Sequence, residues 1–234
     1  MSAKSYHYLT DWASMKPNPR QNNFFYLLIA LLILLIAIPV ADDLNLVSAP
    51  LVRGLVFSGL LTIGVWSLKG GERYFTVGMT FAVSGVILNV LAIKMPSPFL
   101  QFGSLVLLIG FLLVAIMFTM KQVALSNEIS ANRIVGAICL YLLLGVIWAM
   151  AYTLLDLFSP GSFAGFAAMN DQGWDSEWLY FSFVTMTTLG YGDILPVSAM
   201  ARGLAYMQAV VGQFYIAVLV AGLVSAYVSK RSET

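Results

Sequence analysis

Long apolar segments dominate the chain, and polar residues fall mainly in the short stretches between them. A run of about 20 apolar residues is long enough to cross the hydrocarbon core of a bilayer as a helix. Six segments approach or exceed this length, at residues 24–41, 51–68, 74–93, 99–120, 134–157 and 200–228. The pattern therefore predicts an all-α integral membrane protein with six transmembrane helices.

Two shorter stretches have a different pattern. Residues 178–186 are apolar but too few to span a bilayer, so we predict a re-entrant helix between the fifth and sixth transmembrane helices. Near the start of the chain, Tyr8, Trp12 and Met15 recur at helical spacing among polar residues. This spacing favours an amphipathic helix on the membrane surface within residues 1–23. The alternative is a disordered tail with scattered aromatic residues.

Composition agrees with a membrane protein. Of the 234 residues, 60% are hydrophobic and 10% are charged, and the mean hydropathy is +0.87. Soluble domains are about 25% charged. The net charge of +1 argues against a nucleic-acid surface, so no nucleic-acid partner is predicted. His7 and Cys139 are the single histidine and cysteine. We expect a solvated interfacial residue and a buried packing residue there, rather than metal ligands or a disulfide.

The basic residues predict the orientation. Cytoplasmic loops of membrane proteins carry an excess of lysine and arginine. With both termini cytoplasmic, nine of the 12 basic residues fall inside, and Arg53, Lys94 and Arg202 fall outside. The acidic residues that fall outside are Asp42, Asp43, Asp156, Asp171, Asp175, Glu177 and Asp193. We therefore predict a multi-pass protein of the cell membrane with both termini in the cytoplasm.

Residues 187–193 (T-T-L-G-Y-G-D) follow the short apolar stretch and carry the candidate chemistry. A non-helical segment at membrane depth persists only where protein buries it or where it lines a cavity. Gly190 and Gly192 alternate with larger residues, and glycine adopts positive φ without a steric penalty. Alternating backbone hands can turn successive carbonyl groups toward one axis. With the Thr188 hydroxyl, these carbonyls could replace the water shell of a cation.

This stretch resembles the selectivity filter of potassium channels, in which the usual pattern is T-V-G-Y-G. Leu189 stands where valine is usual. The resemblance implies K⁺ as the permeant ion, no cofactor, and a homotetramer in which each chain supplies a quarter of the carbonyl ring. The implied filter residues are Thr188, Leu189, Gly190, Tyr191 and Gly192, with K⁺ bound at the first four.

The residues around the filter have counterparts in the same family. Asp175 or Ser176 can cap the re-entrant helix, whose C-terminal dipole would favour a cation in the inner cavity. The resemblance implies that Tyr180 and Phe181 form an aromatic cuff behind the filter, and the alternative is ordinary interfacial aromatics. We also expect a hydrogen bond from Tyr180 to Asp193. The implied filter-support residues are Tyr180, Phe181, Val184, Thr187 and Asp193, and Val184 stands where some bacterial relatives have glutamate.

The last transmembrane segment contains a candidate hinge and gate. Gly212 lies where the family has a hinge glycine, although close helix packing explains a glycine there equally well. After it, Ile216, Val220 and Val224 recur every four residues. They are predicted to line the inner pore, where apolar rings could gate by dewetting. Packing in a core would produce the same stripe.

The first four transmembrane segments resemble voltage-gated channels in layout only. A voltage sensor needs charges that move through the membrane field, and the fourth segment carries none between Lys94 and Lys121. We therefore reject an arginine-based voltage sensor and leave the gating stimulus open. Asn89 is a candidate for an interhelical hydrogen bond rather than a binding site, and these helices could also bind membrane lipid or a partner.

We interpret the chain as a passive potassium-selective channel and not an enzyme. The predicted parts are the N-terminal segment (1–23), a four-helix membrane domain (24–120), a linker helix (121–133), a pore domain (134–228) and a cytoplasmic tail (229–234). The short tail predicts no cytoplasmic sensing domain, and we expect a bacterial inner membrane. Alternatives are a weakly selective cation channel, a potassium transporter or its pore-like subunit, and a non-conducting membrane sensor or scaffold.

Overall fold

The computed structural model describes residues 23–43, 72–95, 97–125, 131–165 and 176–232. The predicted N-terminal segment, the predicted second transmembrane helix at 51–68 and Asp175 lie outside these ranges. The described part of the chain is almost entirely helical. Its elements are α2 (Asn23–Asp43), α4 (Glu72–Lys94), α5 (Pro98–Leu125), α6 (Ala131–Phe158), β1 (Phe163–Ala164), α7 (Ser176–Met186), β2 (Leu195–Pro196) and α8 (Ala199–Ser232).

The helices follow the apolar segments of the sequence to within a few residues. The segment predicted at 134–157 forms α6, and the short stretch predicted at 178–186 forms the 11-residue helix α7. Two boundaries differ: α8 continues to Ser232, into the predicted tail (229–234), and α5 continues without a break to Leu125. The first five residues of the predicted linker (121–133) therefore belong to α5, residues 126–130 lie outside the described part, and α6 already begins at Ala131.

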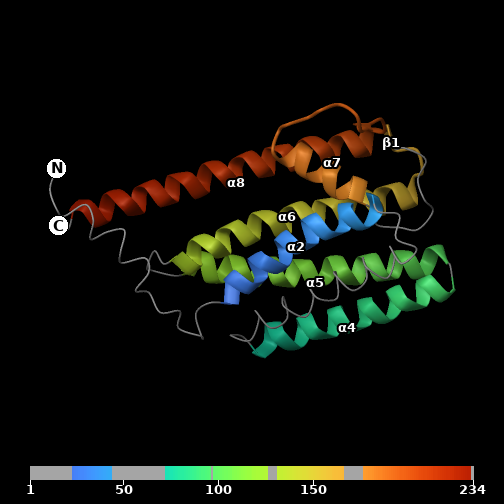
Figure 1. The fold of residues 1–234 in the computed structure, drawn as a ribbon, viewed down its shortest axis with the longest axis horizontal. Helices are drawn as coiled ribbons and strands as arrows, with labels where there is room; N and C mark the ends of the chain where they lie inside the picture. Colours follow the sequence, from blue (N-terminus) through green and yellow to red (C-terminus); the bar gives the residue numbers. More distant parts are fainter. Residues whose placement is uncertain (1–22, 44–71, 96, 126–130, 166–175, 233–234) are drawn as a thin grey trace.

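Neighbouring helices pack side by side along the bundle (Figure 1). α4 packs against α5, α5 packs against α6, and α2 packs against α6 and also contacts α7. α7 lies between α6 and α8 at the end of the bundle where β1 pairs with β2 (Figure 1). The chain thus encloses α7 with helices from both its first and its last third.

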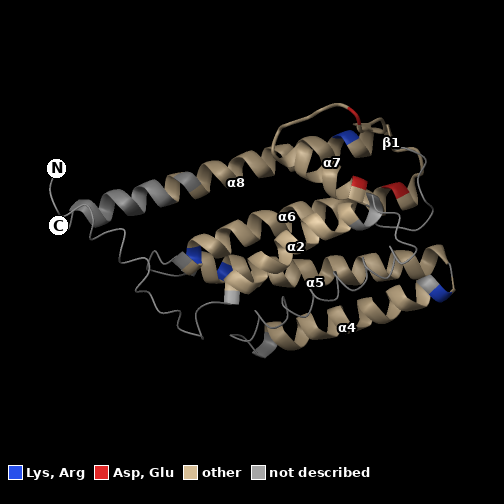
Figure 2. Ribbon diagram, viewed as in Figure 1, with Lys and Arg blue, Asp and Glu red and all other residues tan. Residues whose placement is uncertain are grey.

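Three helices within the described ranges are long and apolar enough to cross a membrane, at Tyr74–Ala92, Pro98–Val123 and Asn132–Phe158. A shorter apolar stretch in α2 covers Phe24–Val40. The charged residues of the described part gather at the two ends of the bundle and leave its middle uncharged (Figure 2). Length, composition and charge placement together make this a membrane protein.

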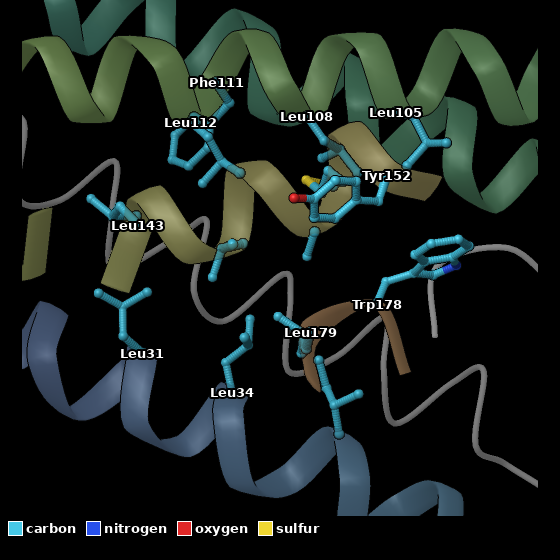
Figure 3. Packing of buried hydrophobic residues seen from close by; sticks show 14 of the residues in the cluster. Leu31, Leu34, Leu105, Leu108, Phe111, Leu112, Leu143, Tyr152, Trp178 and Leu179 are labelled. Carbon is cyan, nitrogen blue, oxygen red and sulfur yellow. The ribbon is translucent and has the colours of Figure 1, made fainter. Parts of the chain in front are cut away.

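Apolar side chains form one buried core, to which α2, α5, α6 and α7 contribute most of the residues (Figure 3). Leu31 and Leu34 point from α2 toward α6 and α7, and both are fully buried. From the other side, Phe111 and Leu112 of α5 point toward α6 and are buried to the same degree. In lipid, such helices associate through close van der Waals packing, because hydrocarbon offers apolar groups an equally good environment. This packing holds α6 between α2 and α5, and α7 packs against α6, α8 and α2.

Candidate functional site

The candidate filter begins where α7 ends, and its backbone amides are tied back to that helix. The Thr187 N–H donates to the Phe183 carbonyl (2.9 Å), and the Thr188 N–H donates to the Thr185 carbonyl (3.1 Å). The next two amides, at 189 and 190, both donate to the Val184 carbonyl, at 2.9 and 3.3 Å. The last helical carbonyls would otherwise have no partner, so these bonds cap the C-terminal end of α7. They also fix where the filter stretch starts.

The backbone of this stretch alternates in hand. Gly190 and Gly192 have positive φ values of 53° and 80°, as their position in the sequence predicts. Thr188 also has a positive φ, of 59°, and among the described residues it is the one non-glycine residue that does. A β-branched residue in this region is strained, which is a feature of functional sites. Every second residue from 188 to 192 is thus left-handed, the arrangement that turns successive carbonyls the same way.

A hydrogen bond joins α7 to the end of the filter stretch. The Tyr180 hydroxyl donates to the Asp193 carboxylate (Oη–Oδ2 2.5 Å), and the Tyr180 ring stacks on Tyr191 with centroids 6.4 Å apart. The Ile194 N–H donates to the other carboxylate oxygen of Asp193 at 3.0 Å. The bond between the side chains lowers the pKa of Asp193 and raises the pKa of Tyr180 to about 12. The structure therefore contains the Tyr180–Asp193 contact that the sequence analysis expected.

Phe181, the second residue of the proposed cuff, faces another part of the molecule. It is buried in an aromatic cluster with Tyr152, Phe163 and Trp178, and its ring centroid lies 4.9 Å from that of Tyr152. Val184 is also buried. Thr187, in contrast, is exposed, and its hydroxyl donates a hydrogen bond to the Phe183 carbonyl (2.7 Å). Tyr180 thus contacts the filter stretch directly, while Phe181 anchors α7 to α6.

A short loop after α6 holds the far end of the filter stretch, and sequence reasoning missed it. β1 and β2 pair antiparallel, with Phe163 opposite Pro196. The Ser162 carbonyl accepts the N–H groups of residues 197 and 198, at 2.9 and 3.2 Å. Gly165 has a φ of 98°, and a methyl group there would collide with the Asp193 carbonyl. The sequence signal is a glycine in a loop, which does not reveal what that loop touches.

Ser198 begins α8 as a helix cap. Its hydroxyl accepts the Ala201 N–H at 3.1 Å, as expected of a serine at the N-cap position. The Arg202 side chain donates through Nε to the Pro196 carbonyl at 3.2 Å. These bonds lock the turn between the filter stretch and α8.

Gly212 lies within an unbroken α8, where it is buried against the end of α7. A methyl group on Gly212 would lie 2.7 Å from both Cγ and the carbonyl oxygen of Met186. This close approach to Met186 supports the close-packing explanation of Gly212, and the hinge stays a prediction. Ile216 is 39% exposed in the single chain. Val220 and Val224 belong to α8, but their side chains lie outside the described part.

Gln208, one turn before Gly212, was not singled out by the sequence analysis. It is fully buried, and its Nε2 donates to the Ser182 carbonyl (3.0 Å) and to the Ser182 hydroxyl (2.7 Å). Its Oε1 accepts the Tyr152 hydroxyl (2.5 Å). A glutamine inside an apolar segment was the available signal, because a buried amide in a membrane needs partners.

A known protein family matches the part of the chain that carries this geometry. Residues 136–229 match a family model described as ion channel. The match covers less than half of the chain and includes most of α6, all of α7, the filter stretch and most of α8. A segment of 47 residues is 47% identical to a protein named two-pore potassium channel 3 from Arabidopsis thaliana. It makes up 20% of this chain and 11% of that relative. No solved structure matches the chain.

The predicted site residues divide into those that the fold brings together and those that it leaves apart. Tyr180, Thr187 and Asp193 all contact the filter stretch or its support within one chain. Leu189 and Tyr191 are 54% and 67% exposed in the single chain. Gly212 and Ile216 lie further along α8, of which Gly212 touches α7. The ion-channel match thus spans both the filter and the candidate gate.

Proposed function

We propose that the chain forms a passive, potassium-selective channel and that residues 188–192 are its selectivity filter. The observation that carries the proposal is the alternation of backbone hand at Thr188, Gly190 and Gly192, in a stretch whose first amides are bound to α7. Amides that donate into α7 leave the carbonyls of the same stretch available to an ion. The ion-channel match over residues 136–229 and the potassium channel named above support the same function.

In this proposal the carbonyls of residues 188–191, with the Thr188 hydroxyl, replace the hydration shell of K⁺. Such carbonyl rings are the known basis of potassium selectivity. Four chains are needed to close the ring, so the channel is a homotetramer. The exposed filter side chains of the single chain then lie against neighbouring copies. Acidic residues near the filter exit, Asp193 among them, raise the local concentration of cations.

We further propose six transmembrane helices per chain, with α7 as a re-entrant helix between the fifth and sixth. In this proposal the protein lies in the plasma membrane and both of its termini lie in the cytoplasm. Opening does not depend on an arginine voltage sensor, because α5 carries no charged residue from Pro98 to Met120. The inner gate is formed by Ile216, Val220 and Val224.

The decisive experiment reconstitutes the purified protein in liposomes loaded with KCl. Flux is measured under opposed K⁺ and Na⁺ gradients, with Ba²⁺ as a pore blocker and empty liposomes as a control. We expect Ba²⁺-sensitive flux that favours K⁺ over Na⁺ by at least about a hundredfold. The Gly192→Ala variant, which strains a φ of 80°, should abolish this preference.

Other outcomes would identify the alternatives. Equal K⁺ and Na⁺ flux would establish a weakly selective cation channel and direct attention to Leu189 and Val184. A wild type without flux, combined with flux after Ile216→Asn opens the apolar gate, would indicate a channel closed at rest. Absence of flux in both proteins would contradict the proposal and favour a non-conducting sensor or scaffold.

A further inference from the structure

A closed circuit of hydrogen bonds lies in the interior between α6, α7 and α8. Tyr152 of α6 donates to Gln208 of α8, and Gln208 donates to Ser182 of α7. The Ser182 hydroxyl then donates to the Gly145 carbonyl of α6 at 2.7 Å, which returns the circuit to its first helix. Tyr152, Ser182 and Gln208 are each 0% exposed. The circuit ties the three helices together.

Each hydrogen-bond donor in this circuit has an acceptor. Both hydrogens of the Gln208 amide are used by Ser182, and the amide oxygen is used by Tyr152. The Ser182 hydroxyl accepts from Gln208, so its own hydrogen is free to go to Gly145. A fully satisfied buried network has one geometry, because any rotation of a member leaves a polar group unpaired. Gln208 is the member that joins α8 to α7.

Ser182 lies next to the carbonyls that hold the filter. Phe183 and Val184, the two residues that follow it, accept the amides of residues 187, 189 and 190. α7 has only 11 residues, so a shift at Ser182 is carried rigidly to these carbonyls. One turn beyond Gln208 on α8, Gly212 packs closely against Met186, the last residue of α7. α8 therefore meets α7 at two successive turns, once by hydrogen bonds and once by close packing.

We propose that Gln208 is a positioning residue for the selectivity filter: through Ser182 it sets the place of α7 and hence the spacing of the filter carbonyls. A displacement of α8 would reach the filter by the same route and change its ion preference. This inference rests on the proposed function of residues 188–192 as a K⁺ site. A purely structural role for Gln208 would instead affect only the stability of the protein.

The test compares two ways of breaking the circuit. Gln208→Met keeps the length of the side chain but removes its bonds to Ser182 and Tyr152, whereas Tyr152→Phe removes only the bond from Tyr152 to Gln208. Gln122→Met is the matched control, since Gln122 is an exposed residue near the end of α5. Each full-length protein is purified in detergent. Its thermal unfolding is followed at increasing K⁺, with Na⁺ holding ionic strength constant, and its K⁺/Na⁺ flux ratio is measured in liposomes.

For Gln208→Met we expect the half-stabilising K⁺ concentration to rise at least about tenfold and the flux ratio to fall by a similar factor. Tyr152→Phe should lose stability but keep both filter measurements within about twofold of wild type. Gln122→Met should match wild type in all three. If Gln208→Met does not assemble, Ser182→Ala replaces it, because it removes one of the two bonds between Gln208 and Ser182, together with the Ser182–Gly145 bond. An increase of about threefold in the half-stabilising concentration is then expected.

Three results would overturn the inference, and they are distinguishable. If wild type shows stabilisation by K⁺ and Gln208→Met, or Ser182→Ala in its place, shows the same half-stabilising concentration and flux ratio, Gln208 does not position the filter. The same conclusion follows if Tyr152→Phe changes the filter measurements as much as Gln208→Met does. If wild type is stabilised equally by K⁺ and Na⁺ and shows no K⁺ preference in flux, the proposed function fails first and this inference fails with it.

Discussion

The two halves of the molecule hold their helices together in different ways. α4 and α5 approach each other at glycines: a methyl group on Gly110 would lie 2.8 Å from the Phe81 ring, and one on Gly85 would lie 3.0 Å from Leu108. In α6, α7 and α8, side-chain hydrogen bonds cross between helices, as in the Gln208 circuit. A further bond of this kind runs from the Tyr215 hydroxyl of α8 to the Ala137 carbonyl of α6 at 2.6 Å.

The difference corresponds to what each half has to fix. Van der Waals contacts at small residues hold two helices close together but tolerate small sliding movements. Hydrogen bonds are directional and specify position along the helix as well as distance. In α4, the hydroxyls of Thr80 and Ser84 donate to carbonyls of their own helix, at 2.8 and 2.6 Å. Under the proposed function, residues that place filter carbonyls require fixed positions, whereas α4 and α5 require only apposition.

The largest effect is expected at Gly165, in the short loop that follows α6. In Gly165→Ala the new methyl group collides with the Asp193 carbonyl, and the residue is also forced to a φ of 98°. Because the obstacle is backbone, no side-chain rotation can relieve it. We expect the variant to lose K⁺-selective flux and most of its tetramer. Flux in liposomes and size-exclusion chromatography would measure this.

Gly161→Ala is the matched control for Gly165→Ala. Gly161 also has a positive φ, of 81°, but a methyl group there meets nothing within 4 Å. The cost is then the strain of the left-handed backbone, about 1–2 kcal/mol, with selectivity retained. Equal damage from the two variants would show that strain alone is harmful and that the loop does not act by contact with Asp193.

The second effect concerns α8, at Gly212 and Gly222. Gly212→Ala presses a methyl group against the backbone of Met186, so overpacking should cost about 1–3 kcal/mol and reduce K⁺ flux several-fold. Gly222 has no atom within 4 Å of such a methyl group in the single chain, and Gly222→Ala should stabilise α8 by about 0.5–1 kcal/mol. Thermal unfolding of both variants tests the packing explanation. A Gly212→Ala protein with wild-type stability but no opening would instead favour the hinge.

Much of the fold follows from the sequence, because segment length and hydropathy determine which residues form membrane helices. The alternation of Gly190 and Gly192 likewise indicates the backbone hands of the filter stretch. The positive φ of Thr188 does not follow, since threonine disfavours it; it occurs where the Thr188 amide is bound to the Thr185 carbonyl of α7. Gln208 was visible as a polar residue in an apolar segment, but its partners lie 26 and 56 residues away. Contacts of that range depend on the packing of whole helices.

A third pair of variants compares the two halves directly. In Gly145→Ala the methyl group collides with the Phe183 ring in the pore half, and in Gly110→Ala it meets the Phe81 ring between α4 and α5. Both should lose about 1–3 kcal/mol of stability, and shortening the aromatic partner to leucine should restore part of it. Only Gly145→Ala should also raise the half-stabilising K⁺ concentration. If both variants raise it equally, the division between a filter-positioning half and a flanking half is wrong.

The smallest effect is a shift in the acid response of the filter exit, caused by the exposed pair of Tyr180 and Asp193. The hydrogen bond lowers the pKa of Asp193 below its ordinary 3.8, so its stabilising effect is complete above that value and is lost as the pH falls through the lowered pKa. The same bond raises the pKa of Tyr180 from 10.0 to about 12, so at the alkaline end it is lost as the pH rises through about 12. Between 3.8 and 10.0 the bond is therefore intact, and flux should not depend on it.

Tyr180→Phe should move the Asp193 pKa up toward 3.8 in a carboxyl NMR titration and start the acid loss of K⁺ flux at higher pH. Tyr206→Phe, at an exposed tyrosine of α8, should leave both unchanged. An Asp193 pKa that stays low without the Tyr180 hydroxyl would mean that backbone donors such as the Ile194 N–H hold the carboxylate by themselves.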